Sequence, residues 1–150
     1  MIRRMPKVAE LVATHASLLY GAKRESEESL EKVEAELGVL LPPEVRWLLL
    51  ECGYGPVHAV SNIRQSVGET HRFRNAVALP HQYVVLEDRD DAGAVLLDTN
   101  SSQGRVLWID THALHRVKTG KLTAGEADEF NTFSEWVQYC ITEALDEPDA

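Results

Sequence analysis

The sequence is poor in cysteine and has no long apolar run. Cys52 follows the run Trp47–Leu50, and Cys140 lies within a helical apolar stripe, so both are expected to be buried, reduced thiols. The stretch after Arg3-Arg4 is broken by polar residues, which argues against a secretory signal. No window approaches the ~20 apolar residues of a transmembrane helix. We therefore expect a cytoplasmic protein with no membrane partner.

Positive charge is also scarce. The 15 lysines and arginines are outnumbered by 24 acidic residues, which leaves a net charge of −9. Such a field repels nucleic-acid phosphates, so direct binding of nucleic acid is not expected. The same field attracts a basic protein and accelerates its association. The charge balance thus favours a basic protein partner.

The usual catalytic motifs are absent. There is no Gly-x-Ser-x-Gly nucleophile turn, no phosphate-binding glycine loop and no HExxH zinc motif. His112-x-x-His115, with His71 and His81 further off, lacks the three or four converging ligands that zinc needs. We therefore predict a protein that is not an enzyme and holds no cofactor.

An acidic segment resembles the start of a calcium-binding loop. In Asp88-x-Asp90-x-x-Gly93 the fifth position is Ala92 and the twelfth is Thr99, so two required oxygen ligands are missing or altered. Turn-favouring aspartates between two strands account for the segment without a metal. We predict no metal site, although a hydrolase that uses these aspartates with a divalent metal remains a third hypothesis.

The order of elements is helices, then strands, then a last helix, which indicates one α+β domain. Apolar spacing predicts a helix over Lys7–Tyr20 and a second helix that contains Leu30 and ends at Gly38. A third helix is predicted from Pro43 to Cys52, since proline is tolerated at the first helical position. That helix is apolar nearly all round, so its Trp47 is expected in the core.

The middle of the chain is predicted to be extended. Three strand-like segments separated by short turns predict an antiparallel meander: Gln82–Leu86, Ala94–Leu97 and Arg105–Ile109. For residues 57–79 the sequence suggests one strand near Val57–Val60 and irregular structure.

The final helix has the clearest signals. Thr132-x-x-Glu135 is a capping-box pattern. Apolar residues then recur at spacings of three and four, namely Phe133, Trp136, Val137, Cys140, Ile141 and Ala144. We predict that this helix covers the sheet with Trp136 in the core, and that Asp146–Ala150 is a flexible acidic tail.

Several of these segments together resemble the SUKH superfamily, the Smi/Knr-like proteins. The similar segments are Glu36-Leu37-Gly38-Val39-x-Leu41-Pro42-Pro43-Glu44-x-x-Trp47-Leu48-Leu49, Gly53-Tyr54-Gly55, the three strands and Phe133-x-x-Trp136-Val137. The resemblance spans about residues 26–145 and leaves 1–25 as an N-terminal helical extension. It implies an α+β fold with N-terminal helices, a central antiparallel sheet and a C-terminal helix packed on it.

The resemblance also implies a function. Many bacterial members resemble immunity proteins that neutralise a cognate toxin by direct binding, and others are regulatory scaffolds without a toxin. We expect the first role, with a basic toxin domain, such as a nuclease, as partner, and a monomer or weak homodimer. The predicted binding residues are the carboxylates of the turn together with two tyrosine anchors: Glu87, Asp88, Asp90, Asp91, Tyr83 and Tyr54.

Overall fold

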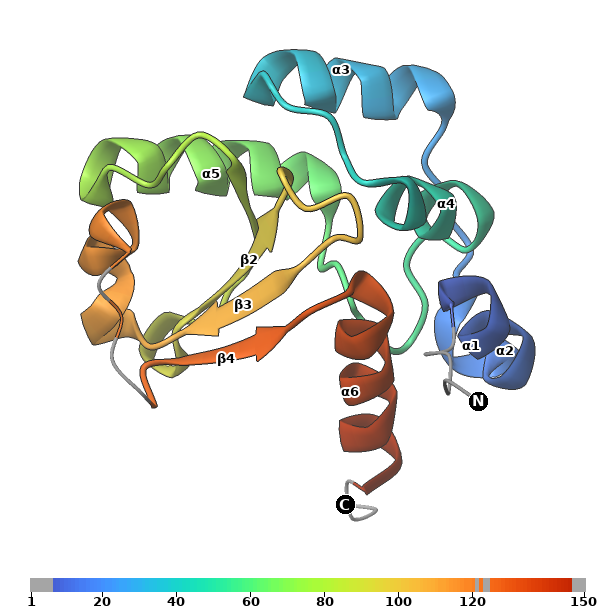
Figure 1. Ribbon diagram of the computed structural model, residues 1–150. Helices are drawn as coiled ribbons and strands as arrows, with labels where there is room; N and C mark the ends of the chain where they lie inside the picture. Colours follow the sequence, from blue (N-terminus) through green and yellow to red (C-terminus); the bar gives the residue numbers. More distant parts are fainter. Residues whose placement is uncertain (1–6, 121, 123–124, 147–150) are drawn as a thin grey trace.

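The computed structural model describes residues 7–120, 122 and 125–146 (Figure 1). In chain order the α-helices are α1 (Val8–Thr14), α2 (Ala16–Leu19), α3 (Glu27–Leu37), α4 (Pro43–Glu51), α5 (Ile63–Val77) and α6 (Phe133–Asp146). The strands are β1 (Tyr83–Asp88), β2 (Ala94–Asp98), β3 (Val106–Ile109) and β4 (Ala127–Phe130), and two 3₁₀ segments are η1 (Asp90–Ala92) and η2 (Thr111–Thr119). The α+β class predicted from the sequence is confirmed.

The first predicted helix is two helices. His15 has φ −124° and ψ 40°, which are not helical angles, and it separates α1 from α2. The apolar residues that suggested one stripe, Val8, Leu11, Val12 and Leu19, are all buried in the main hydrophobic cluster. Because both short helices pack on that cluster, a break between them does not expose the stripe.

The helix α3 ends, and the helix α4 begins, at the predicted signals. Gly38 ends α3 with φ 70°, a left-handed angle that glycine adopts without strain, and Pro43 opens α4. The placement of Trp47 in the core was wrong, because its side chain is 37% exposed. A helix that is apolar nearly all round cannot bury every face, and α4 buries Val45, Leu48 and Leu49 instead.

Residues 57–79 were predicted wrongly, because they contain the fifteen-residue helix α5 and no strand. Asn62 caps this helix, and its side-chain oxygen accepts hydrogen bonds from the backbone N–H groups of Arg64 and Gln65. The buried face of α5 consists of Ile63, Ser66, Thr70 and Phe73. Two of these residues are polar, so the helical period does not stand out in a hydrophobic pattern.

The strands form one antiparallel sheet in the order β1-β2-β3-β4. The predicted meander of three strands is confirmed, and β4 adds a fourth strand beside β3, with Val106 paired to Phe130 and Ile109 to Ala127. A sheet needs its two outer strands protected, because they present unpaired N–H and C=O groups. The two outer strands of this sheet, β1 and β4, differ in how their outward backbone groups are protected.

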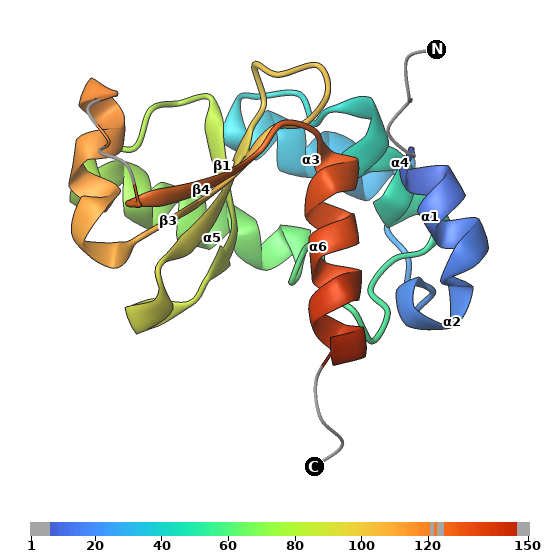
Figure 2. The same ribbon diagram turned by 60° about the horizontal axis from the view of Figure 1, so that its bottom comes forward.

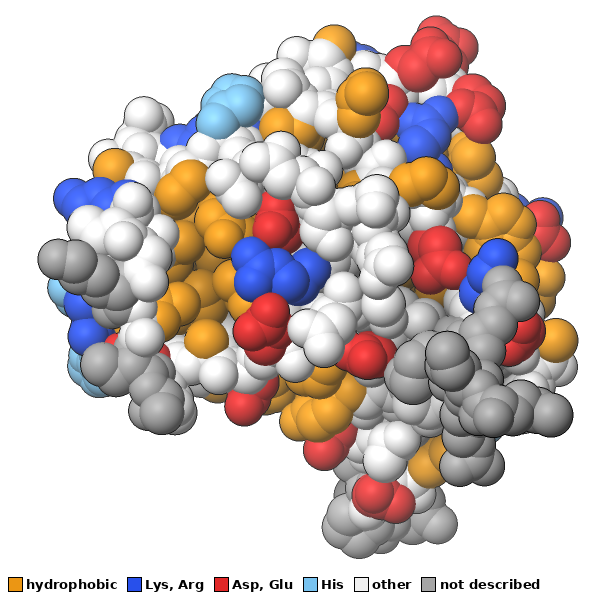
Figure 3. Space-filling model, viewed as in Figure 1, with side chains coloured by type: hydrophobic (Ala, Val, Ile, Leu, Met, Phe, Trp, Pro, Cys, Tyr) orange, Lys and Arg blue, Asp and Glu red, His pale blue; other side chains and the backbone are white. Residues whose placement is uncertain are grey.

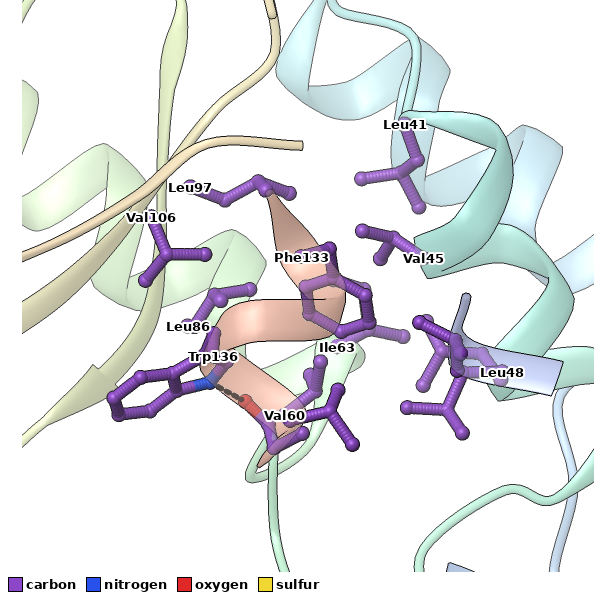
Figure 4. Close-up of a cluster of buried hydrophobic side chains, with 14 of the residues drawn as sticks. Leu41, Val45, Leu48, Val60, Ile63, Leu86, Leu97, Val106, Phe133 and Trp136 are labelled. Atoms are coloured by element: carbon purple, nitrogen blue, oxygen red, sulfur yellow. Dashed lines mark hydrogen bonds between the residues drawn. The ribbon is translucent and has the colours of Figure 1, made fainter. Parts of the chain in front are cut away.

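Each face of the sheet has its own hydrophobic cluster. One face packs against α6, which also contacts α1 and α4 (Figure 2). In this cluster Phe133 and Trp136 of α6 are fully buried, and the Trp136 indole donates a hydrogen bond of 2.7 Å to the Ala59 carbonyl (Figure 4). The prediction that the last helix packs on the sheet with Trp136 in the core is therefore confirmed.

The opposite face packs against α5 and η2. Its cluster includes Phe73 of α5, Leu96 and Leu107 of the strands, and Leu114 and Val117 of η2. Figure 3 shows hydrophobic side chains gathered over the sheet beside η2, with basic and acidic side chains at their border. The sheet is thus buried on both faces, and its alternate residues divide between two clusters.

The predicted capping box of α6 is present in a modified form. Thr132 Oγ1 accepts the hydrogen bond from the Glu135 backbone N–H, as expected. The Glu135 carboxylate accepts from the N–H of Asn131, one residue before the cap. The helix runs to Asp146, and the remainder of the predicted acidic tail, 147–150, lies outside the described residues.

Candidate protein-binding surface

The acidic tip, residues 87–91, consists of the end of β1 and the first part of the turn that leads to β2. Asp90 has a left-handed φ of 52°, which aspartate tolerates better than most residues, and its N–H donates to the Asp88 carboxylate at 3.0 Å. Thr111 Oγ1 donates to the Asp90 carbonyl oxygen at 2.6 Å. These bonds fix the backbone of the tip against the start of η2, so the tip has a defined conformation.

The four carboxylates predicted to bind a partner are not equivalent. Glu87 forms an ion pair with Arg89 at 3.1 Å, and Asp88 forms one with Arg72 of α5 at 2.5 Å. Asp90 and Asp91 are exposed, and within the described residues their carboxylates form no ion pair. The structure therefore does not bring all four side chains together: Glu87 and Asp88 lie on opposite faces of the sheet, and only Asp90 and Asp91 keep uncompensated charge.

The two predicted tyrosine anchors lie elsewhere. Tyr83 is at the opposite end of β1 from Asp88 and is only 9% exposed. The Tyr54 hydroxyl donates to Glu25 Oε2 at 2.7 Å and accepts from the Ile63 N–H at 3.1 Å. Burial, and then the bond to Glu25, raise the pKa of Tyr54. Tyr83 is buried, Tyr54 is half-buried with its hydroxyl bonded to Glu25 and Ile63, and neither ring contacts the acidic tip.

An aromatic cluster that the sequence analysis missed lies next to the tip. Its members are Trp108 of β3, Phe130 of β4, and Trp136 and Tyr139 of α6, with ring centroids 5.0–6.4 Å apart in the contacting pairs. Trp136 is buried, whereas the other three rings are half-buried. The signal available in the sequence was the spacing of three between Trp136 and Tyr139, which places both on one helix face.

Arg89 connects the acidic tip to this cluster. Its guanidinium lies 4.4 Å from the centre of the Trp108 ring and 5.6 Å from that of Trp136, a cation–π arrangement. The Trp108 indole N–H in turn donates to the Ala92 carbonyl at 2.7 Å. The tip and the half-buried rings therefore form one continuous surface. We call residues 87–92 with Trp108, Phe130 and Tyr139 the tip surface.

Carboxylates surround the aromatic part of the tip surface. Burial, and then Glu143, raise the pKa of the Tyr139 hydroxyl, and Asp128 acts in the same direction. Burial raises the pKa of the neighbouring Cys140 thiol to about 12, which keeps it protonated. Tryptophan, tyrosine and arginine are the residues that most often dominate binding energy at protein interfaces. The arrangement therefore suits the docking of a protein with a basic surface.

A shallow concavity of about 200 Å³ lies between the tip and β4. It is lined by Ala92, Trp108, Asp110, Gly125, Glu126, Ala127 and Asp128. A small pocket with both an aromatic wall and carboxylates can receive a long basic side chain, whose methylene groups pack on the ring.

The described residues contain neither a cluster of metal-ligating side chains nor a helix that could span a membrane. Among residues 7–120, 122 and 125–146, no three His, Cys, Asp or Glu side chains converge in a way that could hold a metal ion. None of the helices in that part of the chain combines the length and apolar character needed to cross a bilayer. Protein binding is the chemistry that the described surface supports best.

Comparison with known proteins identifies the family. No curated protein matches the chain. A model of the SUKH_5 family, described as SMI1-KNR4 cell-wall, matches residues 5–142, and that range includes every strand and the first helix. Proteins of this family typically bind partner proteins. The chain therefore belongs to the SMI1-KNR4 family of the SUKH superfamily.

Proposed function

We propose that this protein is an immunity protein that neutralises a cognate toxin by binding it through the tip surface. The observation that carries the proposal is the half-buried aromatic cluster with Arg89 stacked on it, next to two carboxylates with no ion pair in the described residues. Aromatic side chains supply the apolar centre of an interface, and the surrounding charges select the partner.

The charge of the protein indicates what kind of toxin it binds. A net charge of −9 favours a basic partner, and nuclease toxins are basic where they hold phosphates. Asp90 and Asp91, which follow Arg89 in the tip, are exposed, and the exposed Asp128 of β4 lines one concavity with Trp108. Their negative charges would occupy the positions of phosphates in the toxin's active site and exclude its substrate.

The test is a pull-down with the product of the adjacent gene, followed by association kinetics. A one-to-one complex with a toxin domain is expected, and its association rate should fall as salt rises between about 50 and 500 mM. Recovery of host proteins alone would contradict the immunity role and favour a regulatory scaffold of the same family.

A pair of double variants tests the surface itself. Asp90→Asn with Asp91→Asn should slow association several-fold at low salt and flatten the salt dependence. Glu28→Gln with Glu31→Gln makes the same change in net charge on the exposed face of α3, and association should change much less. Equal effects of the two variants would mean that only net charge matters and that the tip is not the binding site.

A further inference from the structure

The two edges of the sheet differ in how they are protected. On β1 the outward N–H of Val85 donates a hydrogen bond of 2.9 Å to Thr70 Oγ1 of α5, so this helix covers the edge. On the other side β4 is the outermost strand, and α6 follows only at its end (Figure 1). No described element pairs with β4 from outside.

The hydrogen-bonding phase of β4 shows which groups face outward. Asp110 N donates to Glu126 O at 2.8 Å, and bonded pairs alternate along an antiparallel ladder. Residues 128 and 130 therefore direct their backbone groups to β3, whereas Ala127 and Glu129 direct theirs away from it. Among the described residues, these outward N–H and C=O groups have no hydrogen-bond partner.

The side chains of this edge are acidic. Asp128 and Glu129 are exposed and lie on opposite faces of β4, because successive residues of a strand alternate. Glu129 forms an ion pair of 3.0 Å with Arg105, and Asp128 forms none with any residue of the described ranges. Each face of the edge therefore offers a carboxylate to an added strand.

The charge decides between two kinds of added strand. If β4 of a second copy paired here, carboxylates of one chain would lie near those of the other, and like charges across a strand pair are destabilising. Both copies would also carry a net charge of −9. An extended basic segment would instead pair its lysine or arginine side chains with Asp128 on one face or with Glu129 on the other, depending on its register.

We propose that β4 binds an extended basic segment of the partner protein as a fifth strand of the sheet. Backbone hydrogen bonds to Ala127 and Glu129 supply affinity, and the two carboxylates supply specificity, as in other cases of β-strand addition. The inference rests on the proposed function only for the partner's identity. The added strand would lie beside the concavity lined by Trp108 and Asp128, so it extends the tip surface.

The experiment uses end-blocked eight-residue peptides and the ¹⁵N-labelled full chain. An alternating lysine–threonine peptide at millimolar concentration should shift the amide signals of Ala127 and Glu129 and slow hydrogen exchange of both amides at least about tenfold at saturation. Two controls isolate the cause. A lysine–proline peptide has the same charge but lacks half of the backbone donors, and a glutamate–threonine peptide has the opposite charge. Neither should slow this exchange.

Variants of the protein separate backbone from side chain. Glu129→Pro removes the outward N–H and should abolish the protection of Ala127, whereas Glu129→Ala retains that N–H and should weaken binding without abolishing it. The comparison of peptides on the unmodified chain remains decisive even if the proline variant fails to fold.

The outcomes distinguish this inference from the proposed function. Equal effects of the lysine–threonine and lysine–proline peptides, or no change at Ala127 and Glu129 with either, would overturn strand addition. Neither result would bear on a toxin complex found by pull-down. Conversely, protection by the lysine–threonine peptide alone would support the added strand even if no toxin were recovered.

Discussion

Replacing Thr70 by valine tests whether α5 protects the β1 edge through one hydroxyl group. Thr70 is fully buried, and its Oγ1 is the acceptor for the N–H of Val85, which is also fully buried. Valine has nearly the same shape and the same branching at Cβ, so the substitution removes the acceptor without opening a cavity. The remaining change is a buried N–H with no partner.

The size of the effect follows from that loss. A buried donor left without a partner costs about 1–3 kcal/mol, more than the net contribution of an ordinary hydrogen bond. Since domains of this size are stable by about 5–15 kcal/mol, Thr70→Val should remove a clear fraction of the free energy of unfolding. The methyl group that replaces the hydroxyl recovers a small part of this loss through apolar burial.

Urea unfolding followed by circular dichroism measures the change. The matched control is Thr142→Val, the same substitution at an exposed position of α6, which should alter the free energy of unfolding by less than about 0.5 kcal/mol. If Thr70→Val were as mild as this control, the hydroxyl would not be what protects the edge. The contrast drawn between β1 and β4 would then lose its basis.

Three other measurements test separate parts of the structure. Trp136→Ala should lower the free energy of unfolding in urea by about 3–5 kcal/mol, because the whole indole is buried. Burial disfavours the charged form of Glu25, but the hydrogen bonds that its carboxylate accepts, first from Tyr54, outweigh this and lower its pKa below 4.5. Ionisation of Glu25 therefore stabilises the fold above about pH 4.5, and this contribution is lost as the pH falls through the lowered pKa. Glu25→Gln should accordingly lower the free energy of unfolding in urea less at acidic pH than at neutral pH. With a pKa of about 12, the Cys140 thiol should react with Ellman's reagent far more slowly in the native protein than in urea at pH 8.

The elements predicted correctly are those whose burial pattern is made of apolar side chains. In α6, Phe133, Trp136 and Val137 recur at helical spacing and all three are buried. The strands β1 to β3 are continuous apolar runs because each is covered on both faces. In these segments the local pattern and the tertiary environment agree, so sequence alone was sufficient.

The helix α5 and the strand β4 were missed because polar residues occupy positions in them where a hydrophobic pattern would be expected. Ser66 and Thr70 are buried on α5, and the second is there to bond the backbone of β1. The strand β4 has Asp128 and Glu129 at its centre, residues that are uncommon in strands, and it exists because β3 offers it a ladder of hydrogen bonds. Such elements are specified by a neighbour that lies far away in the sequence.

The same reason limited the prediction of the binding surface. The acidic tip was visible as a run of carboxylates, but its partner Arg72 lies on α5, which the sequence analysis had not found. The stacking of Arg89 on Trp108 joins the turn after β1 to the strand β3 and could not be inferred from spacing. Which charges of a cluster remain uncompensated is thus a tertiary property, even where the cluster itself is local.

The acidic character of β4 has two consequences that act in the same direction. An exposed edge strand tends to pair with another copy of itself, and natural proteins prevent this with charged side chains on short edges. Two carboxylates within the four residues of β4 provide that protection, because a second copy would bring carboxylates of its own. A basic strand is not repelled in this way, because its cations pair with the carboxylates of β4. An edge closed to self-association by charge is therefore selective for the partner that the proposed function requires, and no further device is needed to keep the free protein from pairing through β4.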